Sequence, residues 1–365
     1  MLRLDQDEYI PGLQQLVEVV KEQKTPIVAQ LSQGIYGLGE EIETINWDEI
    51  VSLYVEAAVR AQKAGFDGVE ILGSELFKES GNWRYHMSIA MRIITSIKSK
   101  LRNQFSVFFQ VDGYYVFRYL VWEQIFWACD TLKKAGVDAI RVSSHWNEMG
   151  GMSVPHASDV YLSSIIKKVS DIPVILCNRI NDPQMAESLL QSGVADMVGM
   201  ARGLLADPDL PIKAEENRLQ EIRHCIGCNQ GCFDALQSGK AVSCVVNVQA
   251  GKELEPSSDL AYKPKKVLVI GGGPAGMEAA RSAACRGHQV TLWEKADNLG
   301  GQLNLAAAPP RRKEYLTMIR DLELELQRLG VDIVLQKEAT EENVLAFQAD
   351  AIIAVSYTHL QHCGL

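Results

Sequence analysis

The sequence lacks the features that would place this chain in a membrane or outside the cell. No apolar run reaches the length needed to cross a bilayer. The opening residues, Met-Leu-Arg-Leu-Asp-Gln-Asp-Glu, do not form the apolar core of a secretory signal. Because half of the cysteines are also clustered, we predict a cytoplasmic protein with no membrane partner and no disulfide framework.

Basic residues are in the minority. The 365 residues include 36 Lys and Arg against 46 Asp and Glu, which gives a formal net charge of −10. Non-specific nucleic-acid binding depends on basic surface, so this balance argues against a nucleic-acid partner. The length suffices for two domains, and the hydrophobic content of 47% is ordinary for a folded protein. The sequence leaves a homo-oligomer open, and a small-molecule substrate is expected only from the family resemblance that the motifs below carry.

Four of the eight cysteines carry the strongest chemical signal. Cys225, Cys228, Cys232 and Cys244 follow the spacing C-x2-C-x3-C-x11-C. Thiolates are the ligands of iron–sulfur clusters and of structural zinc. A compact trio with a distant fourth thiol is more typical of a [4Fe–4S] cluster, whereas zinc sites more often show two matched pairs. The spacing favours the cluster and leaves zinc, or cysteines without a ligand, as alternatives.

The first two-thirds of the chain repeat a helix–strand unit. The phrases at 63–71 and 134–142 echo each other, and 192–200 is a looser copy. In each, a helix ends at a glycine and a short apolar strand follows. Strands are predicted at 26–31, 68–72, 106–111, 139–142, 173–177 and 196–200, and helices at 8–23, 48–64, 82–101, 118–135, 156–169, 182–192 and 208–220.

This alternation predicts a parallel α/β architecture whose period suits a (β/α)8 TIM barrel. Since only six strands are visible, we expect an incomplete barrel over 1–222 that lacks its first two β/α units. An open doubly wound sheet is the alternative. The loops after the last two barrel strands commonly hold a phosphate, and Arg179 and Arg202 follow those strands here. Surface salt bridges are the alternative role for both arginines.

A partial Rossmann-like domain is predicted at 262–355. An apolar strand at 266–270 runs into Gly271-Gly-Gly-Pro-Ala-Gly276, which opens a helix, and Glu294 ends the next apolar stretch. Such glycines let a pyrophosphate approach backbone N–H groups, and the acid accepts from ribose hydroxyls. Either FAD or an NAD-type nucleotide suits this pattern. The last residues, 356–365, fit no expected element.

The barrel, the cysteine segment at 223–252 and the dinucleotide fingerprint, in that order, resemble the NADH:flavin oxidoreductase family of the 2,4-dienoyl-CoA reductase and trimethylamine dehydrogenase type, which has an old yellow enzyme-like barrel. Specific phrases are Cys225-Ile-Gly-Cys-Asn-Gln-Gly-Cys232, Leu299-Gly-Gly-Gln302 and Arg202-Gly-Leu-Leu-Ala-Asp-Pro208. The resemblance implies FMN in the barrel, a [4Fe–4S] cluster on the cysteines and FAD in the next domain. It implies an oxidoreductase that passes electrons from NAD(P)H to an activated alkene, such as an enoyl or dienoyl thioester.

The resemblance also assigns roles to single residues. It places Gln30 against the flavin ring of FMN and the four cysteines on the cluster. The FMN phosphate falls to Arg179, Ala201 and Arg202, and FAD to Gly271, Gly273, Ala275, Gly276, Glu294 and Gln302.

Several positions depart from the family pattern. Gln33 and Leu72 stand where the family has histidines, and the loop with the family's tyrosine proton donor is missing before 79–84. Gln110 replaces an arginine that would stabilise negative charge on a reduced flavin. His145 is the remaining catalytic candidate, with an ordinary loop histidine as the alternative. These departures leave open a non-catalytic electron-transfer or flavin-binding relative, or an inactive fragment.

Overall fold

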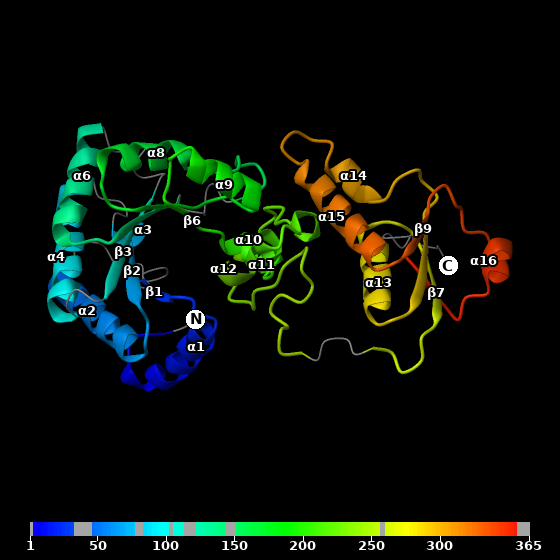
Figure 1. Cartoon of the computed structure of the whole chain (residues 1–365), viewed down its shortest axis with the longest axis horizontal. Coiled ribbons are helices and arrows are strands. Elements are labelled where there is room, and N and C mark those ends of the chain that lie inside the picture. The colour runs from blue at the N-terminus through cyan, green and yellow to red at the C-terminus, as the bar shows by residue number, and fades with distance from the viewer. Residues whose placement is uncertain are drawn as a thin grey trace, which may run out of the picture. The chain divides into compact units, whose positions relative to one another are not determined.

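The computed structural model describes residues 3–32, 46–76, 83–101, 105–112, 122–143, 151–255 and 260–355. The chain divides into two compact units (Figure 1). The first comprises Met1–Met149, His156–Ile180 and Gln184–Gly199, and the second comprises Gly150–Pro155, Asn181–Pro183 and Met200–Leu365. The second unit therefore contains both the cysteine segment and the nucleotide-binding domain. Residues 356–365 lie outside the described part.

The first unit contains a parallel sheet of six strands. They are β1 (Val28–Leu31), β2 (Gly68–Leu72), β3 (Ser106–Val111), β4 (Ala139–Val142), β5 (Val174–Leu176) and β6 (Met197–Val198). Each strand pairs with the next one in sequence, in the order β1-β2-β3-β4-β5-β6. A doubly wound sheet would reverse this order at a switch point, so the order is that of a barrel. The predicted α/β class is confirmed, and the described strands form a partial barrel.

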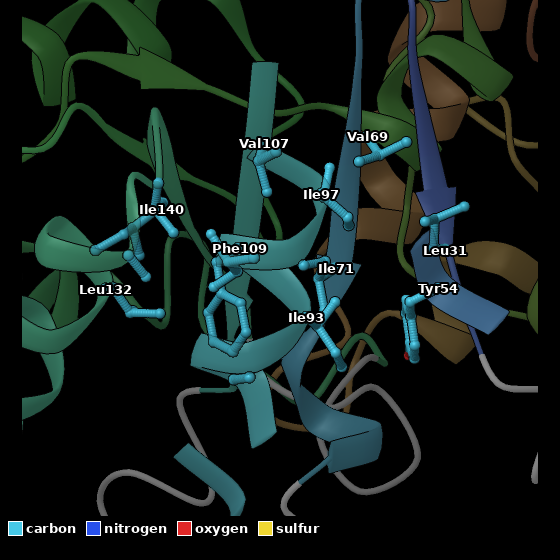
Figure 2. Close-up of a cluster of buried hydrophobic side chains, with 14 of the residues drawn as sticks. Leu31, Tyr54, Val69, Ile71, Ile93, Ile97, Val107, Phe109, Leu132 and Ile140 are labelled. Carbon is cyan, nitrogen blue, oxygen red and sulfur yellow. The ribbon is translucent and has the colours of Figure 1, made fainter. Parts of the chain in front are cut away.

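Helices cover the outer side of this sheet (Figure 1). They are α1 (Ile10–Glu22), α2 (Trp47–Lys63), α4 (Trp83–Leu101), α6 (Trp122–Ala135), α8 (Val160–Val169) and α9 (Pro183–Gln191). The short helix η1 (Asp7–Tyr9) precedes α1, and α3 (Gly73–Leu76) directly follows β2. Successive strand residues point to opposite faces, so Val69 and Ile71 of β2 both face the helical layer. They lie beside Ile93 and Ile97 of α4, and all four are essentially inaccessible to solvent (Figure 2). The apolar core of the first unit thus lies between sheet and helices.

The aspartates of the repeated phrases connect neighbouring strands of the sheet. The Asp67 carboxylate accepts a hydrogen bond from the Ile27 N–H at 2.9 Å, while the Asp67 N–H donates to the Ile27 carbonyl. Asp138 makes the same two hydrogen bonds with Val107, and Asp196 makes them with Val174. Each aspartate also pairs with a lysine of a preceding helix, namely Lys21, Lys98 and Lys167. The repeat therefore locks the start of each of these strands to the preceding strand in the sheet order.

The second unit contains a four-stranded parallel sheet in the order β10-β7-β8-β9. Its strands are β7 (Lys266–Ile270), β8 (Gln289–Trp293), β9 (Asp332–Val334) and β10 (Ala351–Ala354). Its helices are α10 (Ala201–Ala206), α11 (Leu210–Glu215), η3 (Leu219–Glu221), α12 (Phe233–Gln237), α13 (Pro274–Cys285), α14 (Gln302–Ala306), α15 (Glu314–Arg328) and α16 (Glu341–Phe347). The order reverses at β7, which makes the carboxyl end of β7 a topological switch point, the usual ligand position in open α/β sheets.

The helix predicted at 208–220 is wrong as a single element. It is divided into α11 and the short helix η3, because Asn217 between them has a left-handed backbone with φ of 57°. The short helix α10 was not predicted at all. Among the described residues, no helix is both long and apolar enough to cross a membrane.

Candidate functional site

The four clustered cysteines line one pocket of the second unit. Cys225, Cys228, Cys232 and Cys244 all contribute to its wall. The loop that carries the first three is shaped by left-handed backbone at Gly227 and Asn229, with φ of 63° at both. Burial raises the pKa of the Cys228 thiol, and the neighbouring Cys232 and Cys244 act in the same direction. In the described part of the chain, no three His, Cys, Asp or Glu side chains are grouped tightly enough to hold a single metal ion.

A guanidinium also lines the cysteine pocket. Arg202, near the start of α10, donates from Nη1 to Asn229 Oδ1 at 2.6 Å. Asn229 belongs to the cysteine loop itself, so the arginine is fixed to the wall by a side-chain hydrogen bond. The amide of Asn181 donates to the Cys225 carbonyl at 2.6 Å and supports the first cysteine from another loop. The pocket therefore combines four thiols with one fixed positive charge.

The cysteine segment is tied to helix α15 by charged groups. The backbone N–H and the ring Nδ1 of His224 both lie 2.9 Å from Asp321 Oδ2. Arg223 donates from Nη2 to Glu325 Oε2 at 3.1 Å, one turn further along the helix. Burial disfavours the imidazolium, but the hydrogen bond to Asp321 and its charge outweigh burial, so the pKa of His224 is raised. These contacts fix the segment against the nucleotide-binding part of the same unit.

The glycine-rich turn sits at the switch point of the second sheet. It leaves β7 at Gly271, which has φ of 108°, and Gly273 is the N-cap of α13. A Cβ on Gly276 would lie 1.8 Å from the Gly271 carbonyl oxygen, so only glycine allows helix and turn to approach this closely. A Cβ on Gly273 would meet nothing within 4 Å. The open space at Gly273, beside the helix N-terminus, is suited to a pyrophosphate.

Glu294 and a second pair of glycines border the same turn. Glu294 accepts from the Gly272 N–H at 2.6 Å and from the Ala296 N–H at 2.9 Å. Each carboxylate oxygen keeps capacity for a further donor such as a ribose hydroxyl. A Cβ on Gly301 would lie 3.2 Å from the Gly273 Cα, and α14 starts at the adjacent Gln302. The structure thus brings the predicted glycines, Glu294 and the 299–302 phrase together, and Ala275 lies in the first turn of α13.

The inner face of the barrel sheet carries a polar strip. Gln30 Nε2 donates to Glu70 Oε1 at 2.6 Å, and the two residues are register partners on β1 and β2. Arg141 of β4 reaches past β3 and binds the Glu70 carboxylate with two hydrogen bonds, at 2.7 and 2.8 Å. The Glu70 side chain is only 9% exposed. The strip continues to Cys177, where burial raises the pKa of the thiol and Arg141 opposes that rise.

The loop after β5 holds Arg179 in an uncommon conformation. Asn178 and Arg179 both have left-handed backbones, with φ of 78° and 56°. His156 Nδ1 donates to the Arg179 carbonyl at 2.7 Å, and Asn178 Nδ2 donates to Ser158 Oγ at 2.7 Å. Left-handed backbone is uncommon for residues other than glycine and is one of the features that cluster at functional sites. Arg179 is buried, whereas Arg202 belongs to the cysteine pocket in the other unit.

Two family models match the chain. The NADH:flavin oxidoreductase / NADH oxidase family matches residues 88–221, and a family of FAD dependent oxidoreductases matches residues 266–344. A metal reductase of Desulforamulus reducens is 40% identical over 391 aligned residues, which cover 95% of this chain and 58% of that protein. The chain belongs to the NADH:flavin oxidoreductase / NADH oxidase family. The family predicted from the sequence is confirmed.

Further similarities agree with this family. A cinnamate reductase of Clostridium sporogenes is 32% identical over 355 residues, covering 86% of this chain and 52% of that protein. The solved structure of 2-naphthoyl-CoA reductase with 2-naphthoyl-CoA superposes with a TM-score of 0.86 over 96% of this chain and 62% of that chain, at 24% identity, which supports the fold. The chain spans less than two thirds of the length of these relatives.

Gln110, which the resemblance places where the family has a flavin-facing arginine, is hydrogen-bonded at both ends of its amide. Gln110 Oε1 accepts from the Ser74 N–H at 3.0 Å, and Nε2 donates to the Ser143 carbonyl at 2.9 Å. The side chain is 3% exposed and joins the ends of three neighbouring strands. Gln33 and His145 lie outside the described residues, so the catalytic role of His145 stays a prediction.

Sequence reasoning missed Glu70 and Arg141. A signal was available, because both occupy the same position of the repeated phrase, one residue before its end, with opposite charges. In the looser copy this position is Gly199, where a Cβ would lie 2.4 Å from Cys177 Sγ. Cys177, which stands alone in an apolar stretch of the sequence, ends the polar strip beside Arg141. The contact of Arg202 with Asn229 had no sequence signal.

Proposed function

We propose that this chain is the catalytic and electron-transfer part of an NAD(P)H-dependent flavin and iron–sulfur oxidoreductase that reduces an activated alkene, such as an enoyl or dienoyl thioester. The observation that carries the proposal is the second unit, where four thiols line one pocket and their segment is tied by His224 and Arg223 to the nucleotide-binding part. Similarity to a cinnamate reductase supports a conjugated substrate.

The residues fit a [4Fe–4S] cluster better than zinc. A four-iron cluster takes one thiolate on each iron, so its ligands need not converge on one point. A zinc ion draws four ligands to about 2.0–2.3 Å from one centre. The four cysteines share a pocket, and their spacing, a compact trio with a distant fourth thiol, is the one more typical of a cluster. Cys225, Cys228, Cys232 and Cys244 would hold the cluster, which supplies one-electron transfer when bound.

FAD is assigned to the glycine turn of the second sheet, and FMN to the residues that the resemblance implies. Gly271, Gly273, Ala275, Gly276, Glu294 and Gln302 would hold FAD, since the Gly273 cradle is open and Glu294 borders it. For FMN, the proposed residues are Gln30, Arg179, Ala201 and Arg202. The amide of Gln30 donates one N–H to Glu70, and its carbonyl oxygen can accept from a donor such as a flavin ring N–H. Glu70, held by Arg141, thereby orients Gln30.

The test is an absorption spectrum with iron, sulfide and flavin analysis on protein purified without oxygen. The proposal expects about four irons and four sulfides per chain, together with flavin bands, as such cofactors require. Turnover is then assayed with NADH or NADPH and either cinnamate or an enoyl thioester. Protein that contains zinc alone, or no iron, would contradict the cluster assignment. Loaded protein that reduces no alkene would contradict the substrate class.

A second candidate function rests on Gln110. Its amide is uncharged and so offers a reduced flavin no positive charge, and hydrogen bonds to backbone hold both of its ends. This favours a flavin-binding electron carrier that does not reduce alkenes itself. The Gln110→Arg variant separates the two functions, because an added cation would stabilise negative charge on the flavin. Alkene turnover by the unaltered, loaded chain would rule the carrier out.

A further inference from the structure

Arg202 is placed to act on the cysteine pocket as well as on a phosphate. Arg202 lines the same pocket as the four cysteines, and its Nη1 donates at 2.6 Å to Oδ1 of Asn229, another residue of that pocket wall. A guanidinium stays protonated at any ordinary pH and carries five N–H donors. The arginine therefore brings a permanent positive charge to a fixed place beside the thiols.

A fixed charge at this place has a defined electrostatic consequence. Four thiolates around a cluster give it net negative charge, and uptake of one electron makes that charge more negative. No bond is made or broken in this couple. A nearby cation stabilises the reduced form more than the oxidised form, and net charge and hydrogen bonding are among the factors that set cluster potentials. The half-buried pocket weakens solvent screening of the interaction.

We propose that Arg202 raises the reduction potential of the cysteine-bound cluster, and that Asn229 positions it for this role. This inference rests on the proposed cluster. It assigns to Arg202 a task that a phosphate contact alone would not require. The expected consequence is that the cluster accepts an electron at a potential at which the same cluster without the arginine would remain oxidised.

The test compares cluster potentials in variants of the full chain purified without oxygen. Arg202→Gln removes the charge but keeps an amide for Asn229, Arg202→Leu removes both, and Arg202→Lys keeps the charge. Lys240→Gln is the matched control, because Lys240 is an exposed cation of the same segment. Dithionite supplies electrons through mediators, and electron paramagnetic resonance reports the reduced cluster. Iron, sulfide and FMN contents are measured on every sample.

We expect the two neutral variants to lower the equilibrium constant for cluster reduction about tenfold, which is about 59 mV for a one-electron couple. Arg202→Lys should recover most of this loss, and Lys240→Gln should match the unaltered chain. Equal potentials in all variants, with FMN lost from the neutral ones, would overturn the inference in favour of a phosphate contact only. Loss of iron from both neutral variants while Arg202→Lys retains it would overturn it in favour of a purely structural role. Absence of iron from the unaltered chain would contradict the proposed function itself.

Discussion

The two parallel sheets of this chain are assembled alike but differ in what they bury. In both, an aspartate just before one strand makes two hydrogen bonds with the residue at the start of a neighbouring strand, through its carboxylate and its own N–H. Asp67 does so with Ile27, and Asp350 with Lys266. The barrel sheet, however, carries the buried carboxylate of Glu70 on its inner face. Among the described strands β7 to β10, the one buried polar side chain is Thr291.

The difference shows where each sheet keeps its chemistry. The barrel sheet places it on strand side chains, so its inner face is polar and the strip of Gln30, Glu70 and Arg141 depends on strand register. In the second sheet the glycines and backbone N–H groups proposed to hold a nucleotide lie in the turn beyond β7, and the strands serve as packing. Substitutions in the two sheets should therefore act through different physical terms.

The largest effect is expected at Glu70. Glu70→Ala leaves the Arg141 guanidinium, whose side chain is 20% exposed, without its carboxylate. Breaking a buried ion pair in this way costs about 3–5 kcal/mol. Urea unfolding of the first unit would measure the loss. Replacing both residues, Glu70→Leu with Arg141→Leu, should recover much of it, since a hydrophobic pair of similar volume is often tolerated. A loss below about 1 kcal/mol in the single variant would mean that the pair is well solvated.

A core substitution in the nucleotide sheet should cost somewhat less and follow a different rule. Leu292 of β8 is completely buried in an apolar cluster. Leu292→Ala removes methyl groups and leaves a cavity, at a cost of about 3 kcal/mol. Leu305→Ala is the matched control, because Leu305 is 75% exposed and should change stability by less than about 0.5 kcal/mol. Thermal unfolding of both variants tests the pair, and similar losses would contradict the placement of this core.

The hydrogen bonds and ion pairs of these aspartates should make the stability of the first unit sensitive to acid. The Ile27 N–H and Lys21 lower the pKa of Asp67, and Lys167 with the Val174 N–H outweighs burial to lower the pKa of Asp196. Both folded pKa values lie below the unfolded value of about 3.9, so the stabilisation is complete above that pH and is lost as pH falls through the folded values.

Asp67→Asn with Asp196→Asn should lower stability at neutral pH by about 1 kcal/mol per site, because both carboxylates are more than a third exposed. The double variant should also lose less stability than the unaltered chain between about pH 5 and pH 2. Denaturant unfolding at several pH values is the measurement. Parallel pH curves for the two proteins would show that these carboxylates do not drive the acid transition.

Most of the fold could be predicted from the sequence, because it is written in short-range patterns. The 266–270 strand was predicted with the bounds that β7 has, and the glycine turn could be placed because its residues are contiguous. The partners Glu70 and Arg141 are 71 residues apart, and only the equivalence of their positions in the repeat hints at a contact. Asn217 ends α11 by a left-handed backbone that no neighbouring glycine or proline announces.

The smallest expected effect is the difference between two lysines that each pair with an aspartate of the repeat but differ in burial. Lys98 donates to Asp138 at 2.5 Å and to the Phe105 carbonyl at 3.2 Å, and its side chain is 16% exposed. Lys21 pairs with Asp67 at 3.0 Å but is 43% exposed. Solvent and salt screen the exposed pair more, so Lys98→Gln should cost about 1 kcal/mol and Lys21→Gln about 0.3 kcal/mol. Unfolding in low and high salt tests this order. If sodium chloride removed both contributions equally, burial of the lysine would not decide the strength of these ion pairs. The stabilisation would then come mainly from the hydrogen bond between the carboxylate and the strand N–H.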